Sequence, residues 1–360
     1  MNLDKVFSEL TIIELSSVLA GPAVGMFFAE LGAKVIKIEN TSTNGDVTRH
    51  WKTKKDGPDN PLSAYYYSVN WNKETHLLNL EDSTERHKVL NWITSADIVI
   101  SNFKKGSAEK LGMDSKSLRA RNEKLIYARI SAYGDENPKP GFDVSMQAKT
   151  GWMYMNGNPD GPPTKMPVAL IDLLAAHHLK EGILIALMSR MKTGKGSTIS
   201  VSLFDSSIAS LANQASNWLN LNQVPERLGS AHPNIAPYGD LVETKDGVQL
   251  IITTGTEHQF IELCKLLNLN ELILDPKFDS NLKRLKRREE LLRILINKTL
   301  EFSFDELVDR DKDLKSVLVR IQNLKQVFEN EQANNLILTQ KEENGSISKR
   351  VKTAIFKIVE

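Results

Sequence analysis

One carboxylate in the sequence is notable for its surroundings. Asp172 follows the apolar stretch 167–171 and precedes a long run with helical periodicity. A carboxylate held beside apolar residues can act as a covalent nucleophile, as it does in several enzyme classes. Aspartate is also favoured at the start of a helix, where its side chain accepts backbone N–H groups. The residues alone therefore leave a catalytic group and a structural cap open as interpretations of Asp172.

A short turn at 17–22, Ser-Val-Leu-Ala-Gly-Pro, is a second candidate for chemistry. It lies between a predicted strand and a predicted helix. In open parallel sheets, ligands bind beyond the carboxyl ends of the strands, where helix N-termini present N–H groups to phosphate. Glu39, at the end of the next strand, resembles the ribose-binding acid of dinucleotide folds. The glycine fingerprint of those folds is absent, which disfavours a nicotinamide site and leaves a structural turn as the alternative.

Five lysines form the third candidate group, and three of them follow the segment 97–103 at the end of a predicted strand. Lysine at that edge of an α/β sheet can neutralise a nucleotide phosphate. A solvated surface charge is the alternative for each of them, because lysine side chains are usually exposed. The five are Lys37, Lys73, Lys104, Lys105 and Lys110.

These candidates fall at the ends of a repeated strand and helix pattern. The first strand, helix and strand form a βαβ unit, which implies a parallel pair with a right-handed crossover. Repetition of this alternation favours an α/β layer architecture. We predict strands over 11–15, 34–38, 97–100, 125–130 and 198–203, and helices over 23–31, 85–93, 118–124 and 172–192.

The composition of the sequence changes after about residue 222. Prolines and glycines mark a connecting loop over 225–239, which is followed by a predicted strand at 248–253 and a predicted helix at 283–300. We therefore expect a large domain over 1–222 and a smaller α+β domain with its linker over 223–330.

Composition narrows the class of protein. The 360 residues are 41% hydrophobic and 25% charged, as in ordinary globular proteins. The net charge of +1 gives no global field toward nucleic acid or an anionic membrane. The single cysteine, Cys264, precludes an intrachain disulfide, and no Cys/His spacing typical of a zinc site occurs. Without a signal-peptide pattern or a bilayer-spanning apolar run, we expect a cytoplasmic protein.

The motifs, taken in order, resemble those of the family III CoA-transferases, which include formyl-CoA and carnitine CoA-transferases and the related α-methylacyl-CoA racemases. The resemblance runs nearly end to end, and the shared order of the motifs carries it. They include 20–22 (Ala-Gly-Pro), 31–39, 45–46 (Gly-Asp), 72–73 (Asn-Lys), 96–103, 142–143 (Phe-Asp), Asp172, 202–205 and 275–278.

The resemblance implies a Rossmann-like large domain, a smaller domain and an interlocked homodimer, with residues 331–360 returning to the large domain. It also implies that Asp172 attacks an acyl-CoA thioester and passes CoA, as an aspartyl-CoA thioester, to an acceptor carboxylic acid without ATP or metal. CoA is a substrate in this scheme, and no tightly bound cofactor is expected. The implied CoA contacts are Leu19, Ala20, Asn40, Leu78, Asn102, Phe103, Lys104, Lys110 and Lys139.

Several departures from the family pattern bear on function. Asn40 and Lys110 stand where arginine is common, and lysine keeps the charge but loses the bidentate fork. Phe142 occupies the position of the histidine base of the racemases, which favours CoA transfer over proton transfer. The glycine-run loop of the formyl-CoA enzymes is absent, so formate and oxalate are poor substrate candidates. An acyl-CoA racemase or epimerase and a non-catalytic CoA-binding homologue stay open as alternatives.

Overall fold

The chain folds into two compact units. The structure is a computed structural model that describes residues 3–57, 62–311, 316–342 and 344–359. Unit 1 comprises the described residues within 1–152, 165–213 and 332–360, and unit 2 those within 153–164 and 214–331. The domain boundaries expected from the sequence stay a prediction.

A six-stranded sheet forms the centre of unit 1. Its strands are β1 (Thr11–Leu15), β2 (Lys34–Asn40), β3 (Glu74–Leu78), β4 (Ile98–Ser101), β5 (Ile126–Ser131) and β6 (Thr198–Ser202). All neighbouring strands pair in parallel, in the order β3-β2-β1-β4-β5-β6. This is the strand order of a Rossmann fold, in which the winding reverses between β1 and β4. The expected Rossmann-like architecture is confirmed.

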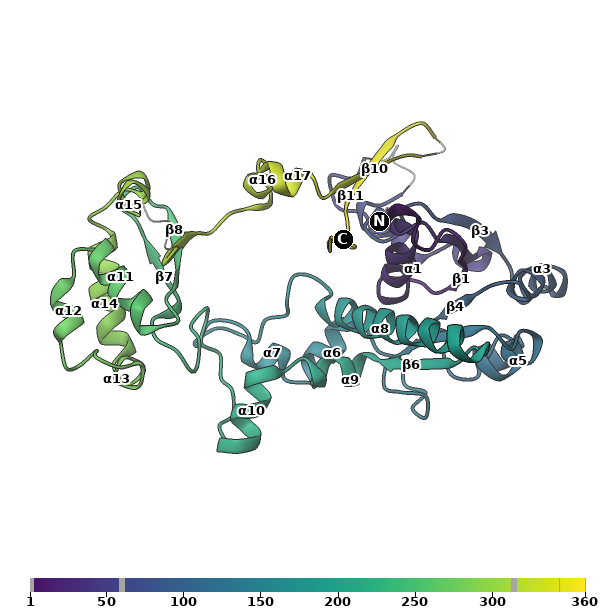
Figure 1. Cartoon of the computed structure of the whole chain (residues 1–360), viewed down its shortest axis with the longest axis horizontal. Helices are drawn as coiled ribbons and strands as arrows, with labels where there is room; N and C mark the ends of the chain where they lie inside the picture. Colours follow the sequence, from purple (N-terminus) through teal and green to yellow (C-terminus); the bar gives the residue numbers. More distant parts are fainter. Residues whose placement is uncertain (1–2, 58–61, 312–315, 343, 360) are drawn as a thin grey trace. The chain divides into compact units, whose positions relative to one another are not determined.

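Helices cover both faces of this sheet. On one face, α1 and α8 pack against apolar side chains of the strands, such as Ile98 and Ile126, and Figure 1 shows α8 running alongside β6. On the other face, α3 and α5 contribute Ile93 and Leu118 to a second core. The helices are α1 (Ala20–Glu30), α2 (Ala64–Tyr67), α3 (Ser83–Ile93), α4 (Ser107–Lys110), α5 (Ser115–Arg121), α6 (Asp143–Lys149), α8 (Leu170–Thr193) and α9 (Leu203–Ala209).

Shorter elements complete unit 1 and join it to unit 2. The 3-10 turns are η1 (Leu3–Lys5), η2 (Thr41–Thr43) and η3 (Val47–His50), and helices α7 (Trp152–Met155), α10 (Ala212–Leu221) and α17 (Glu331–Asn334) lie where the chain passes between the units. Strands β10 (Ile337–Lys341) and β11 (Ile347–Val351) form an antiparallel hairpin. Beyond it, the Glu30 carboxylate of α1 accepts the N–H groups of Thr353 and Ala354 at 2.8–2.9 Å.

Unit 2 is an α+β unit with its own core. Its antiparallel sheet has the order β7 (Tyr238–Glu243), β8 (Gln249–Thr253) and β9 (Leu318–Arg320). Phe260, Leu263 and Leu295 lie in the core between the sheet and the helices. The helices are α11 (Glu257–Leu266), α12 (Asn270–Leu274), α13 (Asn281–Lys286), α14 (Arg288–Thr299), α15 (Phe304–Arg310) and α16 (Leu324–Val327).

One predicted helix of unit 2 is wrong. The segment 283–300 is not continuous, because the chain leaves helical geometry at Arg287, between α13 and α14. The flanking arginines bind different partners: Arg284 pairs with Glu257 at 2.7 Å and Arg288 with Asp240 at 3.0 Å. These tertiary contacts accompany the break, and helical periodicity alone does not reveal them.

No helix of the described residues is both long and apolar enough to cross a membrane.

Candidate functional site

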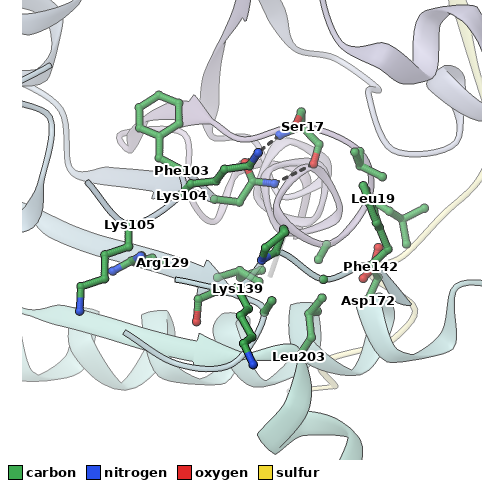
Figure 2. Close-up of a pocket in the computed structure, with 18 of the residues that line it drawn as sticks. Ser17, Leu19, Phe103, Lys104, Lys105, Arg129, Lys139, Phe142, Asp172 and Leu203 are labelled. Atoms are coloured by element: carbon green, nitrogen blue, oxygen red, sulfur yellow. Dashed lines mark hydrogen bonds between the residues drawn. The ribbon is translucent and has the colours of Figure 1, made fainter. Parts of the chain in front are cut away.

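The candidate site lies at the carboxyl ends of β1 and β4, where the winding of the sheet reverses and where open α/β sheets bind their ligands. A cavity of about 340 Å³ opens there in unit 1. In Figure 2, Leu19, Phe142 and Asp172 lie at one side of it, and Phe103 and Lys105 at the other. Its lining is residues 17–20, Val47, 102–105, 129–132, 137–142, Asp172 and Leu203.

Asp172 lies in the first turn of α8 and is 8% exposed. Burial, and after it the negative charge of Asp143, raises the pKa of Asp172 to about 7. Ala169, not Asp172, occupies the cap position of the helix. Asp143 accepts the Ile171 N–H at 2.7 Å, so this end of α8 is bonded by a residue of α6. The interpretation of Asp172 as a structural cap is therefore wrong, and its carboxylate faces the cavity.

A tyrosine of α2 belongs to the same electrostatic environment. The pKa of Tyr65 is raised to about 12 by burial, and then by the charges of Asp172, Asp143 and Asp46. Sequence reasoning missed Tyr65 because the run 65–67 contains three adjacent tyrosines. Nothing in that run tells which ring faces the carboxylates.

A second cavity, of about 540 Å³, adjoins the first and shares Ser17, Val47 and residues 102–104 with it. The two cavities together bring eight of the nine predicted CoA contacts to one region. Leu19, Ala20 and Lys139 line the first cavity, Asn40 and Lys110 the second, and Asn102, Phe103 and Lys104 both. Their roles as CoA contacts stay predictions.

Leu78 is the predicted contact that the structure places elsewhere. It is 8% exposed and packs in the core between the sheet and α3, and it lines neither cavity. As the last residue of the edge strand β3, its side chain points into this core while the backbone continues toward Asn79, which lines the second cavity. A side-chain contact from Leu78 to CoA therefore has no support in the geometry.

The turn between β1 and α1 has an unusual backbone. Val18 adopts a φ of +72°, a left-handed conformation that is costly for a β-branched residue. Asn102 binds the Ser17 backbone twice, accepting its N–H at 3.3 Å and donating to its carbonyl at 2.9 Å (dashed lines in Figure 2). The Val18 N–H donates to the Asp46 carboxylate at 3.1 Å. The side chains of Asn102 and Asp46 thus bond the backbone polar groups of Ser17 and Val18 in this turn.

Two lysines considered as phosphate ligands are instead buried under this turn. Lys37 donates to Glu14 at 2.9 Å and contacts Asp46 at 3.1 Å, and all three side chains are fully buried. Lys73 pairs with the other oxygen of Glu14 at 2.8 Å. Burial alone would lower the pKa of Lys37, but the carboxylates of Glu14, Asp46 and Glu39 outweigh it and raise that pKa. The interpretation of Lys37 and Lys73 as phosphate ligands is wrong, because both ammonium groups are enclosed by protein.

Glu39 is likewise bound within the protein. Its carboxylate accepts from Arg49 at 2.6 Å, from the Tyr66 hydroxyl at 2.8 Å and from the Asp46 N–H at 2.9 Å. The arginine also lies over the Tyr66 ring, 4.4 Å from its centre. With both oxygens engaged, Glu39 is not placed to bind a ribose, and the dinucleotide interpretation is not supported.

The sequence places the chain in a known family. Residues 7–357 match CoA-transferase family III. The chain belongs to this family. A succinate–glutarate CoA-transferase of Agrobacterium fabrum is 35% identical over 97% of this chain and 88% of that protein. A succinyl-CoA:glutarate CoA-transferase of Mus musculus is 36% identical over 81% of this chain, which spans 66% of the length of the mouse protein.

A solved structure of the family has the same fold. A CAIB/BAIF family protein from Brucella suis shares 33% identity with this chain and superimposes with a TM-score of 0.83, over 98% of this chain and 93% of that one. The resemblance to family III CoA-transferases is confirmed, and the chain is an enzyme of the CoA-transferase class.

Proposed function

We propose that this enzyme transfers CoA from an acyl-CoA to a carboxylic acid through a covalent thioester on Asp172. The observation that carries the proposal is the position of Asp172, which is buried in the wall of the cavity at the carboxyl ends of β1 and β4. Family membership supplies the reaction class. The geometry supports Asp172 as the carboxylate that takes part.

The proposed reaction conserves the energy of the thioester. A carboxylate oxygen of Asp172 attacks the acyl carbonyl, the C–S bond breaks, and CoA leaves as a thiolate from an enzyme–acyl anhydride. The thiolate attacks the Asp172 carbonyl, the donor acid leaves as a carboxylate, and an aspartyl-CoA thioester remains. An acceptor carboxylate reverses these steps and takes the CoA. Because the poorly solvated Asp172 carboxylate is more basic than an ordinary aspartate, it is also the better nucleophile.

CoA is proposed to span the two adjoining cavities. The reacting sulfur would lie in the cavity that contains Asp172, and the phosphates in the second cavity, near Lys104 and Lys110. Lysine is a point charge that binds phosphate without the bidentate geometry of arginine. Asn40, which caps the turn η2 by accepting the Ser42 N–H at 2.9 Å, would contribute a neutral contact.

We propose short dicarboxylic acids as the acceptor class. The name of the Agrobacterium relative joins succinate with glutarate, and that of the mouse relative joins succinyl-CoA with glutarate. Phe142, which lines the Asp172 cavity and is 63% exposed, carries no atom that can accept a proton. A two-base racemase mechanism therefore lacks one of its bases at this position.

We also propose that the active form is an interlocked homodimer in the cytoplasm, as the family resemblance implies. The exposed face of α8 carries Ile185 and Met188, which are 68% and 62% exposed in the single chain. With Met191, which is also exposed, they follow one another at intervals of three residues along α8, and a contiguous exposed apolar patch favours a partner surface. Light scattering on the purified protein tests the dimer, and a monomer at micromolar concentration would contradict it.

Trapping the intermediate tests the proposed chemistry. Incubation with succinyl-CoA is expected to give a protein adduct with the mass of CoA less one water, and hydroxylamine is expected to convert it to a hydroxamate on the peptide that contains Asp172. Asp172→Asn should give no adduct and no CoA exchange between succinate and glutarate. Asp160→Asn, which removes an exposed aspartate, is the control. A hydroxamate on another residue, or full exchange by Asp172→Asn, refutes the role of Asp172.

A further inference from the structure

The turn that precedes α1 is held in a strained conformation by Asp46 and Lys37, neither of which lines the cavity that contains Asp172. Val18 has a φ of +72°, and a β-branched residue stays in such a strained backbone only where its surroundings impose it. The residues on either side of the strained peptide, Ser17 and Leu19, line the cavity of Asp172 together with Val18 itself. Whatever imposes this backbone therefore also shapes the wall of the cavity that contains the reacting carboxylate.

Asp46 makes the bond that fixes Val18. Its Oδ2 accepts the Val18 N–H at 3.1 Å and lies 3.1 Å from the Lys37 ammonium. Its Oδ1 accepts the Thr48 hydroxyl at 2.8 Å and the Thr48 N–H at 3.0 Å, and also lies 3.3 Å from the Val18 nitrogen. Lys37 in turn donates to the Ser16 carbonyl at 2.8 Å, one peptide before the turn. The carboxylate and the ammonium thus hold the turn from both ends, and Asp46 itself lines the second cavity but not the one that contains Asp172.

We propose that Asp46 is a positioning residue for CoA transfer, which acts through the Val18 amide to keep the 17–20 turn in the geometry that the Asp172 reaction requires. The inference rests on the proposed function of Asp172. The next residues of the turn, Leu19 and Ala20, begin α1 beside the cavity. A shift of this wall displaces the thioester from Asp172, and a displacement of about 1 Å can slow a reaction by about a hundredfold.

Asparagine is the informative substitution at position 46. If its amide oxygen keeps the two bonds to Thr48, its NH2 group faces the Lys37 ammonium and the Val18 N–H, which are also donors. The Val18 N–H then keeps only its longer contact with Oδ1, at 3.3 Å, because a donor replaces the acceptor that lay 3.1 Å from both Val18 and Lys37. The side chain keeps its volume, so the loss is confined to the polarity of one atom.

The test measures the rate of the chemical step separately from binding. For Asp46→Asn we expect adduct formation at saturating succinyl-CoA to slow by about ten- to a hundredfold, with the Kd for CoA changed by less than about threefold. Rates are taken per active site that finally forms adduct, so partly unfolded protein does not count. Thr48→Val removes one bond to Oδ1, the carboxylate oxygen that makes the longer contact with Val18, and leaves Oδ2 unchanged. It should react within about threefold of the wild type.

A second background separates positioning from a general loss of structure. Glycine takes a positive φ without strain, so Val18→Gly makes the turn less dependent on Asp46. In this background, Asp46→Asn should slow adduct formation by less than about threefold relative to Val18→Gly alone. Because Val18→Gly removes the strain at position 18, it also provides a background in which Asp46→Asn can be tested if the single variant does not fold.

The outcomes distinguish this inference from the proposed function. An Asp46→Asn enzyme that reacts at the wild-type rate overturns the positioning role and leaves the chemistry of Asp172 intact. An equal slowing by Asp46→Asn in the wild-type and Val18→Gly backgrounds also overturns it, because the effect then does not pass through the strained amide. A wild-type enzyme that forms no adduct overturns both proposals.

Discussion

The buried Asp172 carboxylate is expected to make the stability of the enzyme depend on pH. Its pKa rises from 3.8 to about 7, chiefly because burial disfavours the charged form. The folded protein therefore binds a proton that the unfolded chain has already released between these two pH values. Stability is highest below pH 3.8, where the carboxyl is protonated in both the folded and the unfolded protein, and it falls as the pH rises toward 7. Asp172→Asn removes this titration and should remove the loss with it.

The size of the effect follows from the two pKa values. One pKa unit corresponds to about 1.4 kcal/mol, so a carboxyl with a pKa of about 7 in place of 3.8 costs at most about 4 kcal/mol above pH 7. At pH 5 the cost is about 2 kcal/mol, because the unfolded carboxyl has ionised there while the folded one is still protonated. The advantage of Asp172→Asn over the wild type should thus grow by about 2–3 kcal/mol between pH 5 and pH 8.

Urea unfolding of both proteins at several pH values measures this advantage. Four of the five tryptophans, Trp51, Trp71, Trp92 and Trp152, lie in unit 1 with Asp172, so fluorescence follows mainly that unit. Any constant effect of the substitution, such as a changed packing contact, cancels when the two pH values are compared. Glu9→Gln removes an exposed carboxylate of unit 1 and serves as the control.

The result that would refute the reasoning is a difference between Asp172→Asn and the wild type that stays constant from pH 5 to pH 8. Such a result would mean that water or a neighbouring group solvates the folded carboxylate as well as bulk water does. A pH-dependent gain of equal size in Glu9→Gln would also refute it, because the gain would then not come from the burial of Asp172. In either case the explanation of Asp172 as a poorly solvated nucleophile would fail.

Four further outcomes are expected. Adduct formation should rise with pH and be half-maximal near the pKa of Asp172, about 7, and a flat profile in quench-flow contradicts this. Lys37→Met should lower the free energy of unfolding in urea by about 3–5 kcal/mol, because it leaves the buried Glu14 and Asp46 carboxylates without this cationic partner. Glu30→Gln should speed amide exchange at 353–354 about tenfold through weakened hydrogen bonds. Lys104→Ala should raise the Kd for CoA about two- to fivefold, and less in high salt.

Much of the large unit can be predicted from hydrophobic periodicity. The strands β1, β2, β4, β5 and β6 and the helices between them lie within a few residues of their predicted positions, because central parallel strands are short continuous apolar runs. Strand β3 escapes such a prediction, since Glu-Thr-His-Leu-Leu at an exposed edge has no such run. The hairpin of β10 and β11 escapes it for the same reason, as both strands are largely polar.

The candidate site is a harder target for single-sequence reasoning. The family motifs point to Asp172, but the ion pairs of Lys37 depend on partners that only the fold brings together. Lys37 stands between two isoleucines in a central strand, a position that predicts burial on its own. Glu14 likewise stands between two apolar residues, Ile13 and Leu15, in β1. That signal is present in the sequence, whereas the third partner, Asp46, lies in a loop whose path no periodicity predicts.

The pairing of Glu14 with Lys37 also shows why the charges in this sheet matter to function. The two residues are direct neighbours in the register of β1 and β2, and both point to a fully buried layer. A buried ion pair contributes little net stability compared with apolar side chains of the same volume. Apolar side chains, however, cannot bond the Ser16 carbonyl or orient Asp46 toward the Val18 amide. The value of the buried charges therefore lies in the conformation that they impose on the turn beside Asp172.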